Sequence, residues 1–430
     1  MTREDWIGGL PADWTLTRLG ALGSLVKGSG GSKEDNRDSG IPVVRYGEIY
    51  SKFERVIRNA QSFISPEVAH RYTPLPTGSL VFAASGEDPE EIGKAALSLL
   101  SSPALVGGDS VVFTPRKNTV DPVYLSYVLD SKPLRAQKAI RSTGFTVVHI
   151  SAGKLKTLPI PLPPLDEQYA IADYLDQETA QIDALVAKQE EFIGLLQGRR
   201  VAVVDSLAWS GLDSSVEGAE AGIGPRTNSP RHWRRLRNKN IFREVAVPSK
   251  DGSEELLTVS HLSGVTPRSL KNVYMFEAVT TTGYKVVEIG DLAINTMWAW
   301  MGALGVSRCR GIVSPAYGVY RPTVDDIDGR YFDHLFRTPR YVVEMTRHSR
   351  GITSSRLRLY PDAFLSLNVV LPPISEQVAI ADRIEEQISR IDTLITKAEE
   401  HIALAKERRA ALVTAAVTGQ FDVRTARKAG

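Results

Sequence analysis

The chain has 430 residues, of which 42% are apolar and 24% are charged, a balance typical of a folded globular protein with more than one core. Its formal net charge of +2 leaves the class of partner open, and its single cysteine, Cys309, excludes an intramolecular disulfide or a cysteine-based zinc site. No apolar run approaches the ~20 residues that cross a membrane, and the first residues carry acids where a signal peptide is apolar. We therefore expect a cytoplasmic protein with no membrane partner.

The first globular block comprises residues 1–161. Pro11 and Trp14 stand near its beginning, and Gly78 opens a turn into the apolar run Ser-Leu-Val-Phe, a pattern typical of a strand. A second apolar run, Val-Phe-Thr-Pro from Val112, precedes Tyr124-Leu, which opens a predicted helix. Short strands between Gly and Pro turns, with one or two helices, predict a compact α+β domain.

One long helix is predicted in residues 162–208. The prolines at 163–164 end the preceding element, because proline lacks an N–H donor, and Asp166 is the predicted N-cap. Apolar residues follow a four–three spacing typical of a coiled coil. They are Ile171, Leu175, Ile182, Leu185, Phe192 and Leu196. At ~1.5 Å per residue, about 43 helical residues extend ~65 Å, enough to hold two globular domains apart.

Residues 209–230 are rich in Gly, Ser and Pro without periodicity, which predicts a linker. The second globular block, residues 231–370, repeats landmarks of the first. In place of Pro11, Trp14, Gly78, Val112 and Tyr124 it has Pro230, Trp233, Gly290, Val319 and Tyr331.

A second long helix is predicted in residues 371–418, and it repeats the first. LPPISEQVAIADRIEEQISRID from Leu371 matches LPPLDEQYAIADYLDQETAQID from Leu162 without a gap, at an offset of about 209 residues. Ser375 is the predicted N-cap, and the apolar seam continues at Ile380, Ile384, Ile391 and Leu394. Residues 419–430 form a C-terminal tail. The polar residues that interrupt both seams are best explained as register-fixing positions of a coiled coil.

Charge alternates along the chain: the globular blocks carry roughly +3 and +7, and the helices roughly −6 and −2. Basic blocks suit DNA phosphates, whereas acidic helices suit protein partners. The DNA-binding candidates are Lys27, Arg45, Arg141, Ser142, Thr143, Arg308, Arg310, Arg347, Arg350, Thr353 and Arg356. The two runs that precede the Pro-Pro motifs, from Arg141 and from Arg347, are the strongest of these. Trp298, Trp300 and Met301 are expected to pack in the core rather than to form a stacking surface.

Catalytic signatures are missing. The sequence contains no phosphate-binding loop of the G-x-x-x-x-G-K-[ST] type, no Asn/Asp-Pro-Pro-Tyr/Phe motif of an amino-methyltransferase and no histidine pair with metal-ligand spacing. We therefore expect no catalytic residue, no metal site and no cofactor on this chain.

The chain resembles the specificity subunits of type I restriction–modification systems over essentially its whole length. The resemblance rests on LPPLDEQ at 162–168, LPPISEQ at 371–377, the two helices that follow, and AAVTGQFDVR at 415–424; PADWTLTRLG at 11–20, SGEDPEEIGK at 85–94 and SPAYGVYRP at 314–322 support it. It implies an α+β fold with two target-recognition domains, separated by two long helices that form an antiparallel coiled coil with pseudo-twofold symmetry.

The resemblance also implies partners and a division of labour. Each globular domain would read one half of a bipartite double-stranded DNA site, while the helices set the gap and dock two methyltransferase subunits. Motor–endonuclease subunits would join them, and S-adenosylmethionine, ATP and Mg would bind those partners. Two alternatives stay open: an inactive or antagonist coiled-coil scaffold that binds only proteins, and an unrecognised nuclease or methyltransferase.

Overall fold

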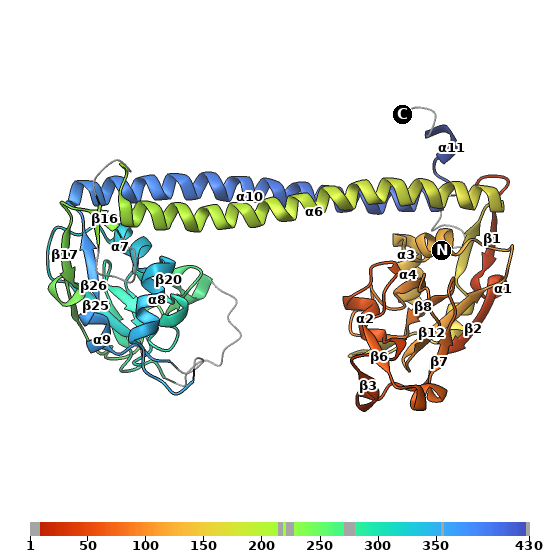
Figure 1. Cartoon of the computed structure of the whole chain (residues 1–430), viewed down its shortest axis with the longest axis horizontal. Helices are drawn as coiled ribbons and strands as arrows, with labels where there is room; N and C mark the ends of the chain where they lie inside the picture. Colours follow the sequence, from red (N-terminus) through yellow and green to blue (C-terminus); the bar gives the residue numbers. More distant parts are fainter. Residues whose placement is uncertain (1–8, 214–217, 221–227, 271–279, 354–356, 427–430) are drawn as a thin grey trace. The chain divides into compact units, whose positions relative to one another are not determined.

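The computed structural model describes residues 9–213, 218–220, 228–270, 280–353 and 357–426. The chain divides into two compact units: unit 1 comprises Met1–Gln189 and Glu400–Gly430, and unit 2 comprises Glu190–Glu399. Each unit holds one globular region and one part of each of two long helices, α6 (Leu165–Ser210) and α10 (Ile374–Val417) (Figure 1). None of the helices in the described ranges combines the length and the apolar character that a membrane span requires.

The two long helices run antiparallel within each unit. In unit 1 the beginning of α6 lies against the end of α10, and Arg409 Nε of α10 pairs with Asp183 Oδ1 of α6 at 2.9 Å. In unit 2 the end of α6 lies against the beginning of α10, and Arg200 Nη1 pairs with Asp392 Oδ1 at 3.7 Å. The fold predicted from the sequence, two α+β regions joined to a pair of long antiparallel helices, is confirmed.

Unit 1 contains two five-stranded sheets, with strand orders β2-β12-β8-β10-β5 and β3-β6-β4-β11-β7. The N-terminal strand β1 pairs antiparallel with β14, which directly precedes α6. The remaining elements are β1 (Thr15–Arg18), α1 (Leu19–Leu22), β2 (Gly23–Lys27), β3 (Asn36–Arg37), β4 (Ile41–Val44), α2 (Tyr46–Ser51), β5 (Val56–Ile57), β6 (Ser62–Ile64), β7 (Thr73–Leu75), β8 (Leu80–Ala83), β9 (Ser85–Gly86), β10 (Ala95–Ser98), β11 (Ala104–Val106), β12 (Ser110–Pro115), α3 (Pro122–Asp130), α4 (Lys132–Arg141), β13 (Val148–His149), α5 (Ala152–Lys156), β14 (Pro159–Leu162) and α11 (Val423–Ala426).

Unit 2 follows the same plan with a smaller sheet, of order β18-β25-β22-β23. Its first strand after the linker, β17, pairs antiparallel with β26, which directly precedes α10. The elements are β15 (Gly218–Glu220), β16 (Asn228–Pro230), β17 (Arg234–Arg237), β18 (Phe242–Glu244), β19 (Leu257–Ser260), β20 (Gly264–Pro267), β21 (Lys285–Val287), β22 (Leu292–Ile294), β23 (Leu304–Val306), β24 (Gly311–Val313), β25 (Gly318–Pro322), α7 (Gly329–Phe336), α8 (Pro339–His348), α9 (Pro361–Ser366) and β26 (Asn368–Leu371).

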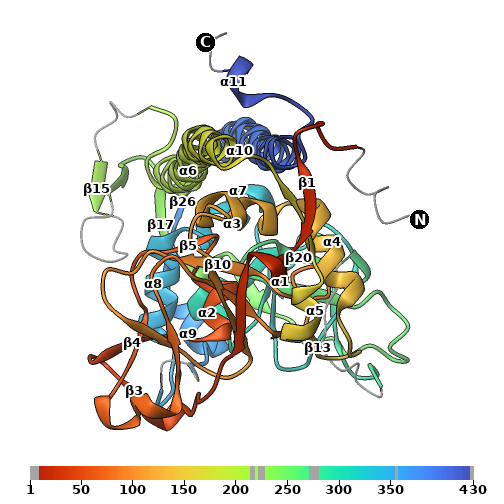
Figure 2. The same ribbon diagram turned by 90° about the vertical axis from the view of Figure 1, so that its right-hand side faces the viewer.

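In each unit the main core includes residues from the long helices. Tyr124 and Leu125 of α3 share one buried cluster with Ile171 and Leu175 of α6 and Val417 of α10. Figure 2 shows α3 directly beside the helix pair. In unit 2 the matching cluster joins Tyr331 and Phe332 of α7 to Trp209 of α6 and to Ile380 and Ile384 of α10. The helices are therefore part of both folded cores.

A buried glutamine fixes the first turn of each long helix to its globular region. Gln168 accepts a hydrogen bond from the backbone N–H of Asp121 at 2.8 Å and donates one to Pro163 O at 2.9 Å. Gln377 accepts from the N–H of Asp328 at 2.9 Å and donates to Asp326 O and Pro372 O, both at 2.9 Å. Both side chains are almost fully buried. We name this pair the glutamine clamps.

The glutamate before each clamp glutamine, Glu167 or Glu376, also helps to attach the helix to its globular region. In unit 2, Glu376 Oε2 accepts a 2.9 Å hydrogen bond from Trp233 Nε1, and its Oε1 lies 2.7 Å from His232 Nε2. In unit 1, Glu167 is buried, and burial raises the pKa of its carboxyl group. Arg424 of the C-terminal segment lies 3.6 Å from this carboxylate. The repeated motifs thus form the joint between helix and globular region.

Two predictions about helix ends were wrong. The helices begin at Leu165 and Ile374, so Pro164 and Pro373 occupy the N-cap positions that were assigned to Asp166 and Ser375. Their carbonyls accept from the amides three and four residues later, and the missing proline N–H costs nothing at a helix start. The first helix also continues to Ser210, because Trp209, expected in the linker, is fully buried in the core of unit 2.

The apolar seam is buried near the globular regions and exposed farther along the helices. Buried members are Ile171, Leu175, Ile182, Leu196, Ile380, Ile384 and Ile391. Leu185, Phe192 and Leu394 are 50%, 42% and 44% exposed, although they follow the same spacing. These three side chains lie on the helices as apolar surface.

We predict that loss of a glutamine clamp destabilises the unit that contains it. Gln168→Ala leaves the Asp121 N–H and the Pro163 carbonyl buried without partners, which costs about 2 kcal/mol. Hydrogen exchange of core amides is expected to accelerate in unit 1 for Gln168→Ala and in unit 2 for Gln377→Ala. The exposed Gln181→Ala on α6 is the control. Equal exchange in all three variants would contradict a clamping role.

Candidate nucleic-acid interface

Lys27 lies in β2, the edge strand of one unit 1 sheet, and Arg45 directly follows β4, the central strand of the other. Lys27 ends β2 and is exposed. Arg45 precedes α2, and its guanidinium group donates to Gly31 O and Ser32 O at 3.3 and 3.4 Å and also to the side chain of Asn36. Arg45 therefore holds the loop that follows Lys27.

The second group in unit 1 lies at the end of α4. The Arg141 guanidinium donates to Gln137 O at 2.9 Å and to Thr157 Oγ1 at 3.3 Å, and partial burial lowers its pKa. Ser142 caps the helix by donating to Ala139 O at 2.7 Å. Thr143 forms an antiparallel bridge with His149. These residues shape one short loop, residues 142–149.

In unit 2 two candidate arginines pair with carboxylates. Arg308 Nη2 lies 3.0 Å from Glu385 Oε1 of α10, so it faces the helix. Arg310 Nε lies 3.2 Å from Glu288 Oε1. Both arginine side chains stay more than half exposed.

The remaining candidates follow α8. Arg347 pairs with Glu344 at 2.6 Å, and Arg350 pairs with Asp362 at 2.7 Å, while Thr353 is exposed. Arg356 lies outside the described residues. Arg350 also forms an antiparallel bridge with Arg358. The described parts of this run, residues 349–353 and 357–358, are therefore joined in the same place, after the second of two helices, as residues 142–149 of unit 1. We name residues 142–149 and these described residues the pinned loops.

A second loop lies beside the pinned loop in each unit. In unit 1, β9 (Ser85–Gly86) pairs with β13 (Val148–His149), so residues 84–93 lie next to residues 142–149. In unit 2, the Leu359 N–H donates to Thr296 O at 2.9 Å, and Thr346 Oγ1 lies 3.5 Å from Trp300 O. Residues 295–303 are therefore the matching neighbour there.

The neighbouring loops differ in chemistry. The unit 1 loop carries Glu87, Asp88, Glu90 and Glu91. The unit 2 loop carries Trp298 and Met301, which are 52% and 38% exposed. The expectation that these two side chains pack in the core was wrong: the one-turn helix Ala299–Met301 buries Ala299 instead. A carboxylate suits a cytosine amino group, and an indole suits a stacked base.

One serine–histidine pair invites comparison with a catalytic site. Ser85 Oγ lies 2.8 Å from His149 Nδ1 and 3.2 Å from Asp109 Oδ1. Among the described residues, the Asp109 carboxylate contacts the serine and no carboxylate hydrogen-bonds to His149, so this pair lacks the acid that orients the imidazole of a catalytic triad. The contact instead ties β9 to β13.

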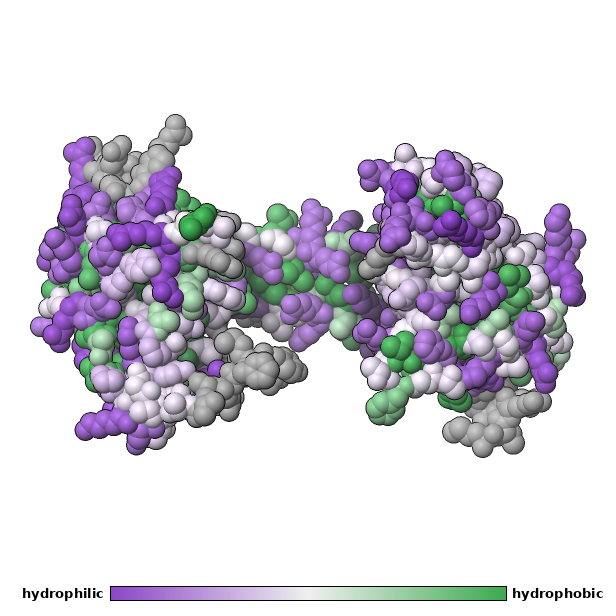
Figure 3. All heavy atoms as spheres, turned by 90° about the horizontal axis from the view of Figure 1, so that it is seen from below, coloured by the Kyte–Doolittle hydropathy of each residue, from purple (hydrophilic) through white to green (hydrophobic). Residues whose placement is uncertain are grey.

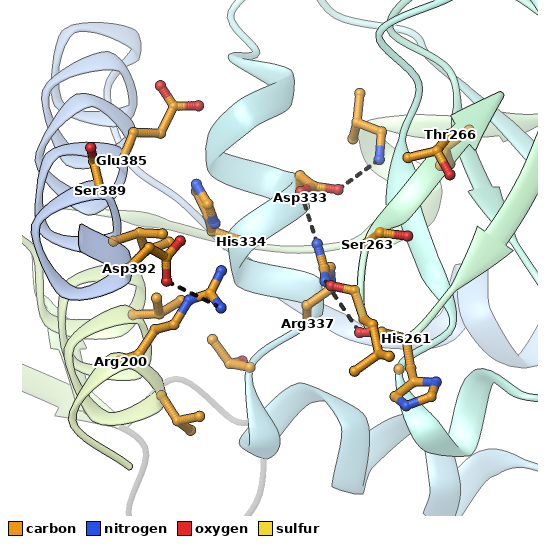
Figure 4. Close-up of a pocket in the computed structure, with 18 of the residues that line it drawn as sticks. Arg200, His261, Ser263, Thr266, Asp333, His334, Arg337, Glu385, Ser389 and Asp392 are labelled. Carbon is orange, nitrogen blue, oxygen red and sulfur yellow. Dashed lines mark hydrogen bonds and ion pairs between the residues drawn. The ribbon is translucent and has the colours of Figure 1, made fainter. Parts of the chain in front are cut away.

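Unit 2 contains a groove between its two helix segments and its globular region (Figure 4). Its volume is about 1080 Å³. The charged groups that line it are paired: Arg200 with Asp392, and Arg337 both with Asp333 and with the Leu262 carbonyl at 2.7 Å. Burial lowers the pKa of His334, so its imidazole is neutral near pH 7. Among the described residues, no three His, Cys, Asp or Glu side chains gather in a way that could hold a metal ion.

On the face that Figure 3 draws, hydrophilic side chains cover most of each globular region, and apolar side chains occur in small separate groups.

The chain is similar to known proteins over most of its length. The family model described as "Type I restriction modification DNA specificity domain" matches residues 11–192. The MjaX specificity subunit of Methanocaldococcus jannaschii, assigned to a type I restriction enzyme, is 25% identical over 97% of this chain and 96% of its own. The EcoKI specificity subunit of Escherichia coli is 22% identical over 96% of this chain and 90% of its own.

Two solved structures share the fold. One chain belongs to a study of complex assembly and conformational transition of a type I restriction–modification system; it has a TM-score of 0.66 and 17% identity and covers 96% of this chain and all of its own. The HsdS subunit from Thermoanaerobacter tengcongensis has a TM-score of 0.53 and 17% identity. The match covers 98% of this chain and 100% of the subunit.

A buried lysine, which the sequence did not single out, supports the loop region of unit 1. Lys138 of α4 donates from Nζ to Gly93 O at 2.8 Å and to Leu129 O at 3.1 Å. Burial lowers the pKa of this amine from 10.5 to about 7. Gly93 ends the acidic loop, so Lys138 fixes that loop to α3 and α4.

We predict that the free energy of unfolding of unit 1 rises with pH above pH 7 because of Lys138. Between pH 7 and 10.5 the unfolded lysine keeps a proton that the folded lysine has lost, so the free energy of unfolding rises by up to about 1.4 kcal/mol per pH unit. Urea denaturation of the wild type between pH 7 and 9 should show this rise, and Lys138→Met should lose it. Lys132→Met, at an exposed position of the same helix, should keep it; a rise that persists in Lys138→Met would refute the assignment.

Proposed function

We propose that the chain is a member of the specificity-subunit family of type I restriction–modification systems and that it reads a bipartite site in double-stranded DNA. One observation carries this proposal: two globular regions of the same plan are each joined to the helix pair by an equivalent clamp, Gln168 or Gln377. A protein with two equivalent reading heads suits a site with two half-sites.

The chain is a DNA-recognition subunit and not an enzyme. The relatives reported above are named as specificity subunits, and none of them is named as a nuclease or a methyltransferase chain. Recognition of this kind needs no cofactor on the chain itself. We place adenine methylation and ATP-dependent cleavage, with S-adenosylmethionine, ATP and Mg, on its partner subunits.

We assign residues 1–161 and 231–370 to the two recognition domains, and residues 162–210 and 371–418 to the helical spacer between them. Residues 211–230 connect the halves, and residues 419–430 form the tail. The loops that differ most in chemistry, at 84–93 and 295–303, are suited to read different bases. The frame is shared, so both half-sites would be approached in the same way.

Exposed apolar side chains on the helices support docking of methyltransferase subunits. Leu185 and Leu394 are 50% and 44% exposed, on α6 of unit 1 and on α10 of unit 2. Because the chain repeats itself, each half offers a similar surface, which suits two copies of one partner. Motor–endonuclease subunits would complete the assembly.

The function is tested by mapping methylated adenines in the genome by single-molecule sequencing, with and without this gene. We expect loss of one split motif: two short half-sites around a fixed gap of unspecified sequence. A catalytically inactive methyltransferase partner should give the same loss, because both subunits act in one complex. An unchanged methylome in a host whose methyltransferase subunit is expressed would overturn the proposed role.

The docking surface is tested with Leu185→Glu and Leu394→Glu. Each buries a carboxylate in the proposed interface, so each should lower the methyltransferase copies that co-purify with the full chain from two to about one. Lys188→Glu, an exposed change of charge on the same helix, is the control. Two retained copies in both leucine variants would remove these residues from the interface.

A further inference from the structure

Each globular region contains one short helical turn directly after the strand that pairs with β14 or β26. In unit 1 this turn is α1 (Leu19–Leu22), and in unit 2 it is the one-turn 3-10 helix Asn238–Asn240. The strand registers show that the two turns match, because the residues before them, Arg18 and Arg237, lie opposite the first residues of β14 and β26. We name these two segments the matched turns.

Three exposed cations lie around the matched turn of unit 1. Arg18 directly precedes the turn, and the backbone N–H of Arg116 donates to Leu22 O at 2.8 Å. Lys156 of α5 lies against Gly20, since a Cβ added to this glycine would stand 3.1 Å from Lys156 Cβ. Figure 2 shows α1 and α5 side by side. The three side chains therefore start from one small area of the surface.

Three exposed cations also lie around the matched turn of unit 2. Arg237 directly precedes the turn, and Lys239 lies within it. Arg243 lies in β18, which follows the turn and contacts it. We name the two groups the turn cations. They are Arg18, Arg116 and Lys156 in unit 1, and Arg237, Lys239 and Arg243 in unit 2.

The positive charge recurs in the two units although it comes from different chain positions. Lys239 has the place of Gly20, and the place of Lys156 is taken by Leu365, as the strand registers show. A lysine at position 20 would crowd Lys156, so each unit carries the lysine at one of two neighbouring places. A charge that two similar surfaces share, but supply from different positions, indicates that the surface itself is used. An anion that both units bind explains this pattern.

None of the turn cations forms an ion pair within the part of the chain that the structure describes. In unit 1, Asp121 caps α3, and Asp13 interacts electrostatically with Arg424 of the C-terminal segment. The segments that form the two surfaces contain no Asp or Glu. These segments are residues 14–33, 110–120 and 150–165 in unit 1, and residues 228–243, 307–324 and 363–375 in unit 2.

Most acids just beyond the unit 2 segments are turned to other groups. Asp326 and Asp362 pair with arginines that are not turn cations. Glu244 directly follows Arg243 in β18, so its side chain points to the other face of the strand. Asp325 is exposed, and its single charge does not balance the three turn cations of the unit. The charge around both matched turns is therefore positive.

The same segments expose little apolar surface. Leu19 and Leu22 of α1 and Ile241, after the turn of unit 2, are buried in the cores. Within these segments, all of which the structure describes, only Val26 and Ile374 are large apolar residues with exposed side chains, and neither adjoins a matched turn. A protein interface usually has an apolar centre, whereas a surface that binds the DNA backbone is polar and positively charged. The turn cations therefore suit phosphates better than an acidic protein surface.

We propose that the turn cations bind backbone phosphates of duplex DNA, one group at each half-site. Contacts to phosphates fix the position of a protein on the duplex without reading a base. Such contacts suit the matched turns, which adjoin the strand pairs shared by both units, rather than the loops 84–93 and 295–303, which differ. This inference rests on the proposed function and adds to it a named set of backbone contacts in each half-site.

The test uses the complex of the full chain with its methyltransferase subunits, a labelled duplex that carries the mapped site, and a random duplex of equal length. Affinity is measured by fluorescence anisotropy at several salt concentrations. Two triple variants each remove the turn cations of one unit, and a third removes three other exposed cations of unit 1 as the matched control. The variants are Arg18→Gln with Arg116→Gln and Lys156→Gln, Arg237→Gln with Lys239→Gln and Arg243→Gln, and the control Lys52→Gln with Arg58→Gln and Lys132→Gln.

We expect each variant of the turn cations to weaken binding of both duplexes by the same factor, about tenfold or more, so the preference for the mapped site is kept. A plot of log affinity against log salt concentration should become less steep by about 3, because each lost phosphate contact accounts for about 1. The control and the charge-retaining Arg18→Lys should bind like the wild type. Because all six side chains are exposed, the variants should keep the thermal unfolding of the wild type; single substitutions, each with a change of about 1, test a triple variant that does not fold.

Unchanged affinity and salt dependence in both variants of the turn cations, with selective binding retained, would overturn the phosphate contacts and leave the proposed function intact. An equal fall in the control would also count against them, since any lost charge would then have the same effect. Loss of methyltransferase copies from these variants would show that the cations bind protein instead. A wild-type complex that binds the mapped site no better than random DNA would contradict both the contacts and the proposed function.

Discussion

A long helix can position a recognition domain only if its first turn is fixed to that domain. In this chain two buried glutamines fix the first turns of the two long helices. Gln168 and Gln377 each satisfy the backbone before a neighbouring helix and the carbonyl of the proline that precedes their own helix. A buried amide must use its donors and acceptor together, so the joint has one geometry. Everything that the helices hold in place depends on this joint.

The shared frame separates what the two units have in common from what distinguishes them. Strand pairs β1–β14 and β17–β26, the clamps and the pinned loops are equivalent. The loops beside the pinned loops are not: one carries four acids, and the other exposes Trp298 and Met301. A protein built in this way can change the bases that it reads without changing how its domains are attached. Loops tolerate such exchange because their side chains contribute little to the core.

Most candidate arginines bind acceptor groups of the chain itself, but an ion pair at the surface contributes little to stability. The exposed pairs of Arg310 with Glu288 and of Arg350 with Asp362 contribute about 0–1 kcal/mol each, so a phosphate can replace the carboxylate at small cost. Arg45 and Arg141 differ, because they bond to backbone or side-chain groups that shape loops. These two arginines are therefore more important for positioning loops than for contacting DNA.

The sequence by itself determined the architecture: the repeat of LPP-x-x-EQ, the four–three seam and the matched glycines and aromatics predicted two α+β blocks on two long helices. Local pattern suffices there because helix periodicity and proline geometry act within a few residues. Only the tertiary structure decided which seam residues are buried, where the helices begin and end, and which DNA-binding candidates lie close together. Leu185 and Ile182 share one seam, yet only Ile182 is buried, and Trp209 sits in a core instead of a linker. Burial depends on packing between segments far apart in the chain, and a pattern along one segment carries no information about its neighbours.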